Sequence, residues 1–192
     1  MPNDILSREY FDRPTRQVAR SLLGKYLVRT TETGPISGRI IEVEAYVGPK
    51  DRASHASRGR TTRTEVMFGP AGIAYVYLIY GMYHCLNVVT ERIDYPAAVL
   101  IRAVDQDVPL SQLIDGPGKL CRAFQIDRSL NGWDLTAGKI LWFEDRGDRV
   151  KPAEILAVPR IGVDYAGEWA AKPWRFRLAK PLNKKEKSKN QK

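Results

Sequence analysis

The sequence has few cysteines, no long hydrophobic run and no export signal, and each absence narrows the class of protein. Its two cysteines, Cys85 and Cys121, are too few for a disulfide framework, so we expect buried free thiols. The longest apolar runs are far shorter than the roughly 20 residues that a membrane helix needs. Residues 1–11, MPNDILSREYF, lack the basic start and apolar stretch of a secretory signal. We therefore expect a cytoplasmic protein without a membrane span.

Metal ligands are also scarce. A zinc site would need both cysteines, His55 and His84 to meet at one point. Because neighbouring strand residues point to opposite faces, His84 and Cys85 would not face the same ion. We expect neither a metal nor another cofactor.

The charge balance points to a polyanionic partner. Against 31 lysines and arginines stand only 22 acidic residues, a net charge of +9. We expect a single domain over residues 1–182 and a lysine-rich, disordered tail over residues 183–192, NKKEKSKNQK. The domain remains basic without the tail. Such a surface gains affinity for phosphates by releasing counterions.

Short runs of β-branched and aromatic residues predict a mostly antiparallel sheet. Strands are expected at residues 25–30, 38–47, 73–81, 84–90, 97–104, 140–145 and 174–179. Asp12 and Pro14 signal a helix over residues 14–24, with Val18, Leu22 and Leu23 on one face. Residues 110–124 predict two short helical pieces that are separated at Gly116-Pro117-Gly118.

One strand carries two carboxylates and a tyrosine on the same face. Since strand residues alternate between faces, Glu42, Glu44 and Tyr46 lie together. The opposite face carries Ile41, Val43 and Ala45. An ionised carboxylate among aliphatic neighbours is costly unless it is paired, hydrogen-bonded or in a wet cleft. Two interpretations stay open: solvated glutamates on an outer face, or a buried catalytic carboxylate.

Residues 48–70 form a long loop that is rich in arginine. Arg58, Arg60 and Arg63 are interleaved with serine and threonine, the donors that phosphate oxygens prefer. A solvated loop without contacts is the alternative. Long loops in compact domains are usually functional or disordered.

An aromatic run follows the loop. Tyr75 and Tyr77 share a strand face, and Tyr75 fits a half-buried core position. Tyr80 precedes Gly81 and should stand at the tip of a hairpin. A tyrosine at an exposed tip contributes little to the packing of the fold, which favours a functional role.

Six motifs in one order resemble a known family. They are EVEAY (42–46), H-x-S-R-G-R-T-x-R (55–63), MF-x-P-x-G (67–72), YVYLIYGMYHCLN (75–87), LIRA (100–103) and GPGKLC (116–121). Together they resemble the alkyladenine DNA glycosylases, also called the mammalian-type 3-methyladenine DNA glycosylases, with this chain as a bacterial-like member. The similarity extends from about Leu22 to residue 176, roughly four fifths of the chain.

The resemblance implies a DNA repair enzyme. Such a hydrolase flips an alkylated, deaminated or etheno purine out of double-stranded DNA and hydrolyses its N-glycosidic bond, which initiates base excision repair. It implies a monomer, nucleoid-associated if bacterial, that needs no cofactor. The fold class it implies is α+β: a single domain with a mostly antiparallel curved sheet, flanking helices and a protruding β-hairpin.

The resemblance also assigns catalytic roles by position. Glu44 matches the general base that activates a water molecule, and Arg102 and the backbone of Ile161 match the groups that hold this water. Because an alkylated purine already carries positive charge and leaves without an acid, one carboxylate suffices for its chemistry. Glu42 has two interpretations: it tunes Glu44 by the proximity of a like charge, or it has a structural role, bridging to Arg39 or Arg102, which we favour.

Further positions match the family's contacts with the base and the DNA. Tyr46 and Tyr77 match the rings that sandwich the flipped base, and His55 matches a residue of the far wall. Asn87 matches the residue that rejects guanine by clashing with its exocyclic amine, and Tyr80 matches a wedge inserted into the vacated stack. The arginine loop is expected to contact DNA.

Two alternatives belong to other classes. A non-catalytic DNA- or RNA-binding module would use the same loop and tyrosines, but it would disfavour a buried carboxylate such as Glu44 beside phosphates. A hydrolase of free nucleosides would leave Tyr80 and the basic loop unexplained.

Overall fold

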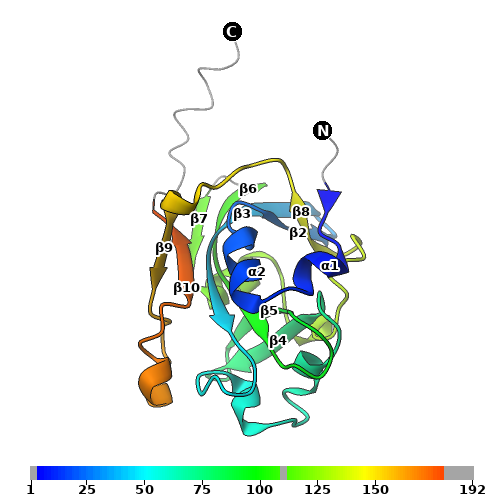
Figure 1. Cartoon of the computed structure of the whole chain (residues 1–192). Helices are drawn as coiled ribbons and strands as arrows, with labels where there is room; N and C mark the ends of the chain where they lie inside the picture. Colours follow the sequence, from blue (N-terminus) through cyan, green and yellow to red (C-terminus); the bar gives the residue numbers. More distant parts are fainter. Residues whose placement is uncertain (1–3, 109–111, 180–192) are drawn as a thin grey trace.

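A long curled antiparallel sheet occupies the centre of the computed structural model, which describes residues 4–108 and 112–179 (Figure 1). Its strands follow the order β1-β8-β2-β3-β6-β5-β4, with β10 and β7 attached at β3 and β6 and β9 paired to β10. Their bounds are β1 Asp4–Ile5, β2 Tyr26–Thr31, β3 Gly34–Tyr46, β4 Ala74–Ile79, β5 Tyr83–Val89, β6 Ala98–Val108, β7 Gln112–Asp115, β8 Leu141–Asp145, β9 Ile155–Val158 and β10 Arg175–Leu178.

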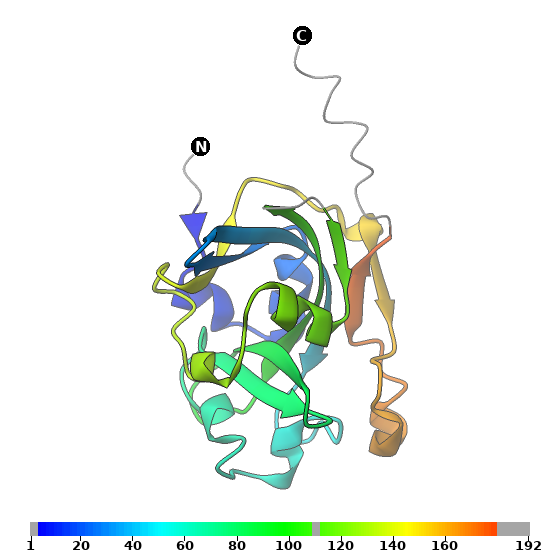
Figure 2. The same ribbon diagram turned by 180° about the vertical axis from the view of Figure 1, so that it is seen from behind.

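Short helices accompany the sheet. They are α1 Arg8–Phe11, α2 Thr15–Leu22, α3 Pro117–Ala123 and the 3-10 turns η1 His55–Arg58, η2 Glu65–Phe68, η3 Arg128–Leu130, η4 Pro152–Glu154 and η5 Asp164–Trp169. In Figure 1, α1 and α2 lie in front of the sheet, and in Figure 2 the view from behind brings α3 to the front. A curled antiparallel sheet with few helices confirms the α+β class. The β4–β5 hairpin was also expected.

Strand β3 connects the two halves of the sheet. One of its edges pairs first with β2 over residues 34–39 and then with β10 over Glu42, Val43 and Glu44. The other edge pairs with β6, where register shifts on both sides of Glu42 leave Ile41 and Arg102 without partners in the ladder. Such bulges bend and twist a strand. Because β10 and β6 flank residues 42–44, this part of β3 lies inside the sheet rather than at an edge.

The bulges also change which residues face the core. Ile41, Val43 and Ala45 were expected on one face, but the main core cluster contains Ile40 with Val43 and Ala45. The expectation for Ile41 was therefore wrong. An extra residue in a strand reverses the alternation of side chains beyond it, and this sequence carries no separate signal for the bulge.

Helix α2 confirms the predicted amphipathic helix. Val18 and Leu22 are fully buried in the main core cluster, together with Phe176 of β10. The helix begins at Thr15, and Asp12 instead ends α1. A residue remote in the sequence stabilises its first turn: Glu91 accepts hydrogen bonds from the Thr15 backbone N–H at 3.0 Å and from the Thr15 hydroxyl at 2.5 Å.

One predicted helical piece was wrong. Residues 112–115 form strand β7, which pairs with β6, whereas residues 117–123 form α3 as expected. Ile114 is buried on β7 and Leu113 is exposed, which is the alternation of a strand. Four residues are too short to separate a period of 2 from one of 3.6.

Several smaller expectations can be compared with the structure. Cys85 and Cys121 are buried and free, as predicted. In the described parts of the chain, no helix has the length and apolarity to cross a membrane. The lysine-rich residues 183–192 lie outside the described residues.

Candidate active site

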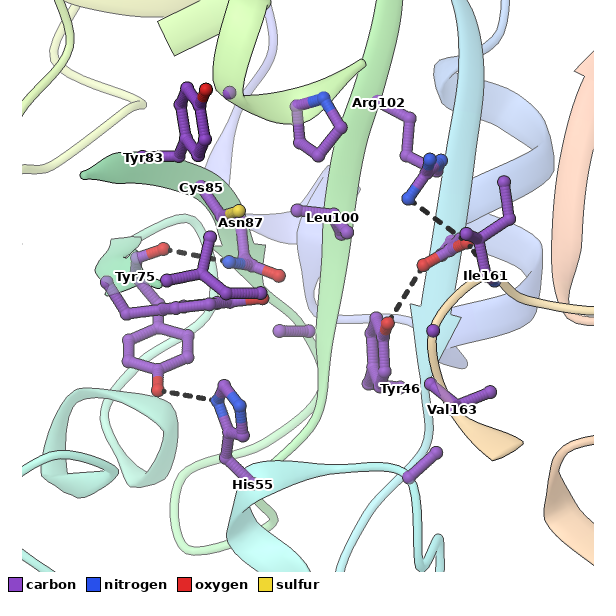
Figure 3. A pocket seen from close by; sticks show the side chains of 18 of the residues that line it. Tyr46, His55, Tyr75, Tyr83, Cys85, Asn87, Leu100, Arg102, Ile161 and Val163 are labelled. Atoms are coloured by element: carbon purple, nitrogen blue, oxygen red, sulfur yellow. Dashed lines mark hydrogen bonds and ion pairs between the residues drawn. The ribbon is translucent and has the colours of Figure 1, made fainter. Parts of the chain in front are cut away.

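A pocket of about 430 Å³ opens between the β4–β5 hairpin and residues 161–165 (Figure 3). Side chains of β3 and β6 lie between these two walls, and the loop after β3 contributes Ala53, Ser54 and His55. Eight of the residues singled out from the sequence line it: Glu44, Tyr46, His55, Tyr77, Tyr80, Asn87, Arg102 and Ile161. Their positions in the sequence are far apart, so the fold brings them together.

Glu44 lies in this pocket as a fully buried carboxylate. One of its oxygens accepts a hydrogen bond from the backbone N–H of Ile161 at 2.9 Å. The other accepts one from the Tyr46 hydroxyl at 2.8 Å. Arg102 Nη1 lies 3.4 Å from the first oxygen. A carboxylate has about four lone-pair directions, so these contacts leave Glu44 capacity to accept a proton from a further group.

Arg102 is held by a second carboxylate. Its Nε donates to Glu42 Oε1 at 3.0 Å, and Arg175 of β10 donates to the same oxygen at 3.0 Å. Glu42 therefore bridges to Arg102, one of the two partners expected for it, and not to Arg39. Because Glu42 holds Nε, the guanidinium is fixed with its Nη1 beside Glu44.

Burial raises the pKa of the Glu44 carboxyl above its usual value, although Arg102, the Ile161 N–H and the Tyr46 hydroxyl act in the opposite direction. A carboxylate with a raised pKa is a stronger proton acceptor when it is ionised. Burial, followed by the charge of Glu44, raises the pKa of Tyr46 well above its usual value. Tyr46 therefore remains a hydrogen-bond donor to the carboxylate.

Aromatic rings form the wall of the pocket opposite Tyr46. The rings of Tyr75 and Tyr77 lie 5.3 Å apart, and the His55 ring meets Tyr77 edge to face at 4.6 Å. His55 Nδ1 is 3.0 Å from the Tyr75 hydroxyl. Asn87 Nδ2 donates to the Tyr75 carbonyl at 3.0 Å, which fixes the orientation of the buried amide (Figure 3). This wall presents flat apolar faces with one fixed polar group.

His55 is a neutral residue at physiological pH. Burial lowers its pKa to about 4, with further lowering by the charges of Arg63 and Arg58. A neutral imidazole offers one donor and one acceptor nitrogen. It therefore adds no positive charge to the pocket.

Tyr80 and Ile161 are exposed on opposite walls of the pocket. Tyr80 occupies the turn between β4 and β5 and is 83% exposed, as expected for a hairpin tip. Ile161 is 51% exposed on the opposite wall. Its backbone reaches Glu44 while its side chain faces outward.

The arginines of the loop after β3 fall into two groups. Arg58 and Arg63 line a second cleft of about 290 Å³, which shares Ser54, His55 and Tyr165 with the first pocket. Arg60 lies elsewhere: it is paired with Glu65 at 2.9 Å and with Asp94, and its guanidinium covers the Phe68 ring. The structure therefore brings two of the three arginines to the site.

A buried ion pair supports the pocket from behind, and sequence reasoning missed it. Arg160 binds Asp51 through both carboxylate oxygens, at 2.5 and 2.8 Å, and both side chains are fully buried. Arg160 also donates to the carbonyl of Ala45 at 2.9 Å and covers the ring of Tyr46. It thus fixes its neighbour Ile161 relative to Glu44. The family resemblance, which extends to residue 176, was the only available signal for Arg160.

Other pocket residues were also missed or assigned elsewhere. Tyr75 is buried, as its core interpretation required, but it lines the pocket as well. Leu100, Val163 and Tyr165 line it too, and no pattern in the sequence distinguishes them from ordinary core or surface residues. Among residues 4–108 and 112–179, no group of three or more His, Cys, Asp or Glu side chains could hold a metal ion.

Comparisons with known proteins give consistent results. The family model described as Methylpurine-DNA glycosylase (MPG) matches residues 9–181, a range that contains every residue lining the pocket. A protein of Methanocella arvoryzae named "Putative 3-methyladenine DNA glycosylase" is 55% identical over 185 residues, which cover 90% of this chain and 91% of the relative. Proteins of the same name from Anaeromyxobacter sp. (strain Fw109-5) and Alkaliphilus oremlandii are 53% and 46% identical, and the matches cover 90% and 89% of this chain and 88% and 94% of the relatives.

Proposed function

Because the chain belongs to the methylpurine-DNA glycosylase family, whose members hydrolyse N-glycosyl bonds, we propose that it flips damaged purines out of duplex DNA and releases them with a water activated by Glu44. Methylpurines such as 3-methyladenine are the first substrates to consider, since the relatives are named for that base. Hypoxanthine and etheno purines are further candidates. The protein acts as a monomer and a single domain, in the cytoplasm or at the nucleoid.

The buried carboxylate is the observation that carries this proposal. Glu44 is fully buried, bonded by Tyr46 and Ile161 and adjacent to Arg102 within one pocket. A solvated surface glutamate would have none of these partners. In the proposed reaction Glu44 takes the proton from water as the water attacks the sugar, and its negative charge stabilises the oxocarbenium-like state.

The water itself is positioned by the groups around Glu44. Arg102 and the backbone of Ile161 lie beside the same carboxylate oxygen. In the proposed mechanism they orient the nucleophile, while Glu42 and Arg175 hold Arg102 in place.

The aromatic walls are proposed to bind the flipped base. Tyr46 and Tyr77 line the pocket on different strands, so a purine between them stacks on both rings. Stacking contributes roughly 1–3 kcal/mol per ring, which offsets the few kcal/mol that unstacking costs. His55 lines the far wall, and Asn87, fixed by Tyr75, rejects the exocyclic amine of guanine.

Contacts outside the pocket are proposed to hold the duplex open. Tyr80 fills the gap that the extruded nucleotide leaves, because an apolar wedge keeps neighbouring bases apart. Arg58 and Arg63 contact phosphates near the second cleft, and Arg60 would join them only if the DNA displaces its carboxylate partners.

The test is single-turnover release of 3-methyladenine and of hypoxanthine from duplex DNA, comparing the native chain with Glu44→Gln. We expect the variant to bind DNA normally and to release either base about 10²–10⁴-fold more slowly, the usual contribution of a general base. Retained release by Glu44→Gln would remove Glu44 from the mechanism.

Glu42→Gln is the matched comparison. It removes one carboxylate charge from the same strand face but leaves Glu44 in place, so we expect a much smaller loss of release. If the native chain binds DNA but releases neither base, the chain would instead be a non-catalytic DNA-binding module.

A further inference from the structure

Both tyrosine rings proposed to stack on the base have an arginine against them. The guanidinium of Arg160 lies 4.8 Å from the centre of the Tyr46 ring. That of Arg63 lies 5.2 Å from the centre of the Tyr77 ring. Both distances are within the roughly 6 Å over which a cation interacts with an aromatic face.

The two arginines stand outside the pocket. Tyr46 and Tyr77 line its wall, whereas neither Arg63 nor Arg160 does. Arg160 is fully buried against Asp51, and Arg63 lines the neighbouring cleft and lies 3.4 Å from His55 Nε2. Arg63 therefore brings a positive charge against a ring of the pocket wall without lining the pocket itself, whereas the charge of Arg160 is balanced by Asp51.

This arrangement changes what the rings attract. A tyrosine face binds cations because its π electrons carry negative charge. When a guanidinium occupies one face, its positive charge counteracts that attraction at the other face and repels a second cation there. A neutral purine does not experience this repulsion.

We propose that Arg63, acting through the ring of Tyr77, contributes to substrate specificity by shifting the preference of the pocket from cationic alkylated purines toward neutral damaged purines. The inference depends on the proposed function, in which both rings stack on the flipped base. The proposed effect concerns the base, which stacks on Tyr77. Positive charge that develops on the sugar is still stabilised by Glu44.

Only one of the two arginines can be replaced without disturbing a buried ion pair. The charge of Arg160 is fixed by its bidentate contact with buried Asp51, and removing it would leave that carboxylate unpaired. Arg63 is exposed, so its replacement leaves the core unchanged. Arg63 is therefore the residue to change.

The experiment measures single-turnover release of 3-methyladenine, which is cationic in DNA, and of hypoxanthine, which is neutral, from otherwise identical duplexes. Work at about pH 8 keeps histidine neutral in every variant. For Arg63→Gln we expect the ratio of the 3-methyladenine rate to the hypoxanthine rate to rise roughly two- to five-fold, the factor that an exposed cation–π contact represents. A ratio cancels changes in general DNA affinity.

Two variants serve as controls. Arg92 is also exposed and lies 5.2 Å from a tyrosine ring, that of Tyr95, which does not line the pocket. Arg92→Gln should leave the ratio at its native value, because it removes the same charge from an unrelated ring. Arg63→Lys retains the positive charge and should keep the ratio close to native.

An unchanged or lower ratio in Arg63→Gln would overturn the inference, and so would an equal rise in Arg92→Gln. These results differ from failure of the proposed function, in which the native chain releases neither base.

Discussion

The buried carboxylate of Glu44 makes the stability of the protein depend on pH in an unusual direction. Most carboxylates with partners have lowered pKa values in the folded state and stabilise it as pH rises. Burial instead raises the pKa of Glu44, despite the opposing contacts with Arg102, Ile161 and Tyr46. The residue therefore favours folding most when it is protonated.

This coupling between protonation and folding predicts how the stability of Glu44→Gln changes with pH. In the unfolded chain a glutamate titrates near about 4.3, below its folded pKa. The stabilising contribution of the carboxyl is complete below the unfolded value and is lost as pH rises through the folded pKa. Since glutamine does not titrate, Glu44→Gln should gain stability relative to the native chain between about pH 4 and pH 8.

Denaturant unfolding of both proteins at the two pH values measures this difference. The free energy of unfolding of the variant, minus that of the native chain, should increase with pH. A decrease would mean that the contacts with Arg102, Ile161 and Tyr46 outweigh burial.

At the scale of residues, the sequence predicted much of the polar site. Alternation along β3 placed Glu44 and Tyr46 on one face, and they share a hydrogen bond. The roles of Arg102, Ile161, His55 and Asn87 came from the resemblance, and they remain predictions. The partners of Arg160 were not predictable, because a lone arginine gives no sign that it will be buried.

At the scale of elements, the β4–β5 hairpin presents its tip to solvent. Tyr80 adopts a φ of 52°, which a tyrosine rarely takes, and Gly81 follows with a φ of 70°. The tight turn therefore projects the tyrosine away from the sheet. The Tyr80 side chain makes no hydrogen bond or ring contact with any other residue of the described structure.

We expect Tyr80→Ala to slow excision at limiting enzyme by roughly five-fold or more, since loss of one stacked ring costs about 1–3 kcal/mol. The melting temperature should remain unchanged, because the side chain is 83% exposed. Met82→Ala is a fitting control: Met82 lies in the same turn and is 67% exposed. Equal losses in both variants would indicate general surface contact instead of a wedge.

The elements that were predicted well are those with strong periodicity. The strands around Tyr26–Thr31, Ala98–Val108 and Leu141–Asp145 and the helix Thr15–Leu22 follow clear patterns. Two features were not predicted: strand β7, and the fact that Ile40 rather than Ile41 faces the main core. Both depend on pairing with β6, which is a tertiary contact, and short segments follow such contacts rather than their own propensity.

At the scale of the whole molecule, the Asp51–Arg160 pair joins the loop after β3 to the chain before η5. Asp51 also accepts hydrogen bonds from the backbone of Val47 and Ala53, so it orders the start of the loop that carries His55. One buried interaction thus positions two walls of the pocket.

Asp51→Asn should lower the free energy of unfolding by about 3–5 kcal/mol, since it leaves a buried guanidinium without a counter-charge. Urea denaturation measures the loss. Glu65→Gln is the comparison, because it breaks the exposed pair with Arg60 and should cost less than about 1 kcal/mol. Similar values for both variants would mean that water reaches Arg160.

Strand β3 depends on the last strand of the described chain, and this order matters during synthesis on the ribosome. Glu42 and Glu44 emerge first, and more than 100 residues separate them from Ile161, whose N–H bonds Glu44, and from β10, which pairs beside them. Until residues 161–178 have been made, Glu44 lacks its backbone N–H partner, β3 lacks its neighbour along that edge and one wall of the pocket is missing.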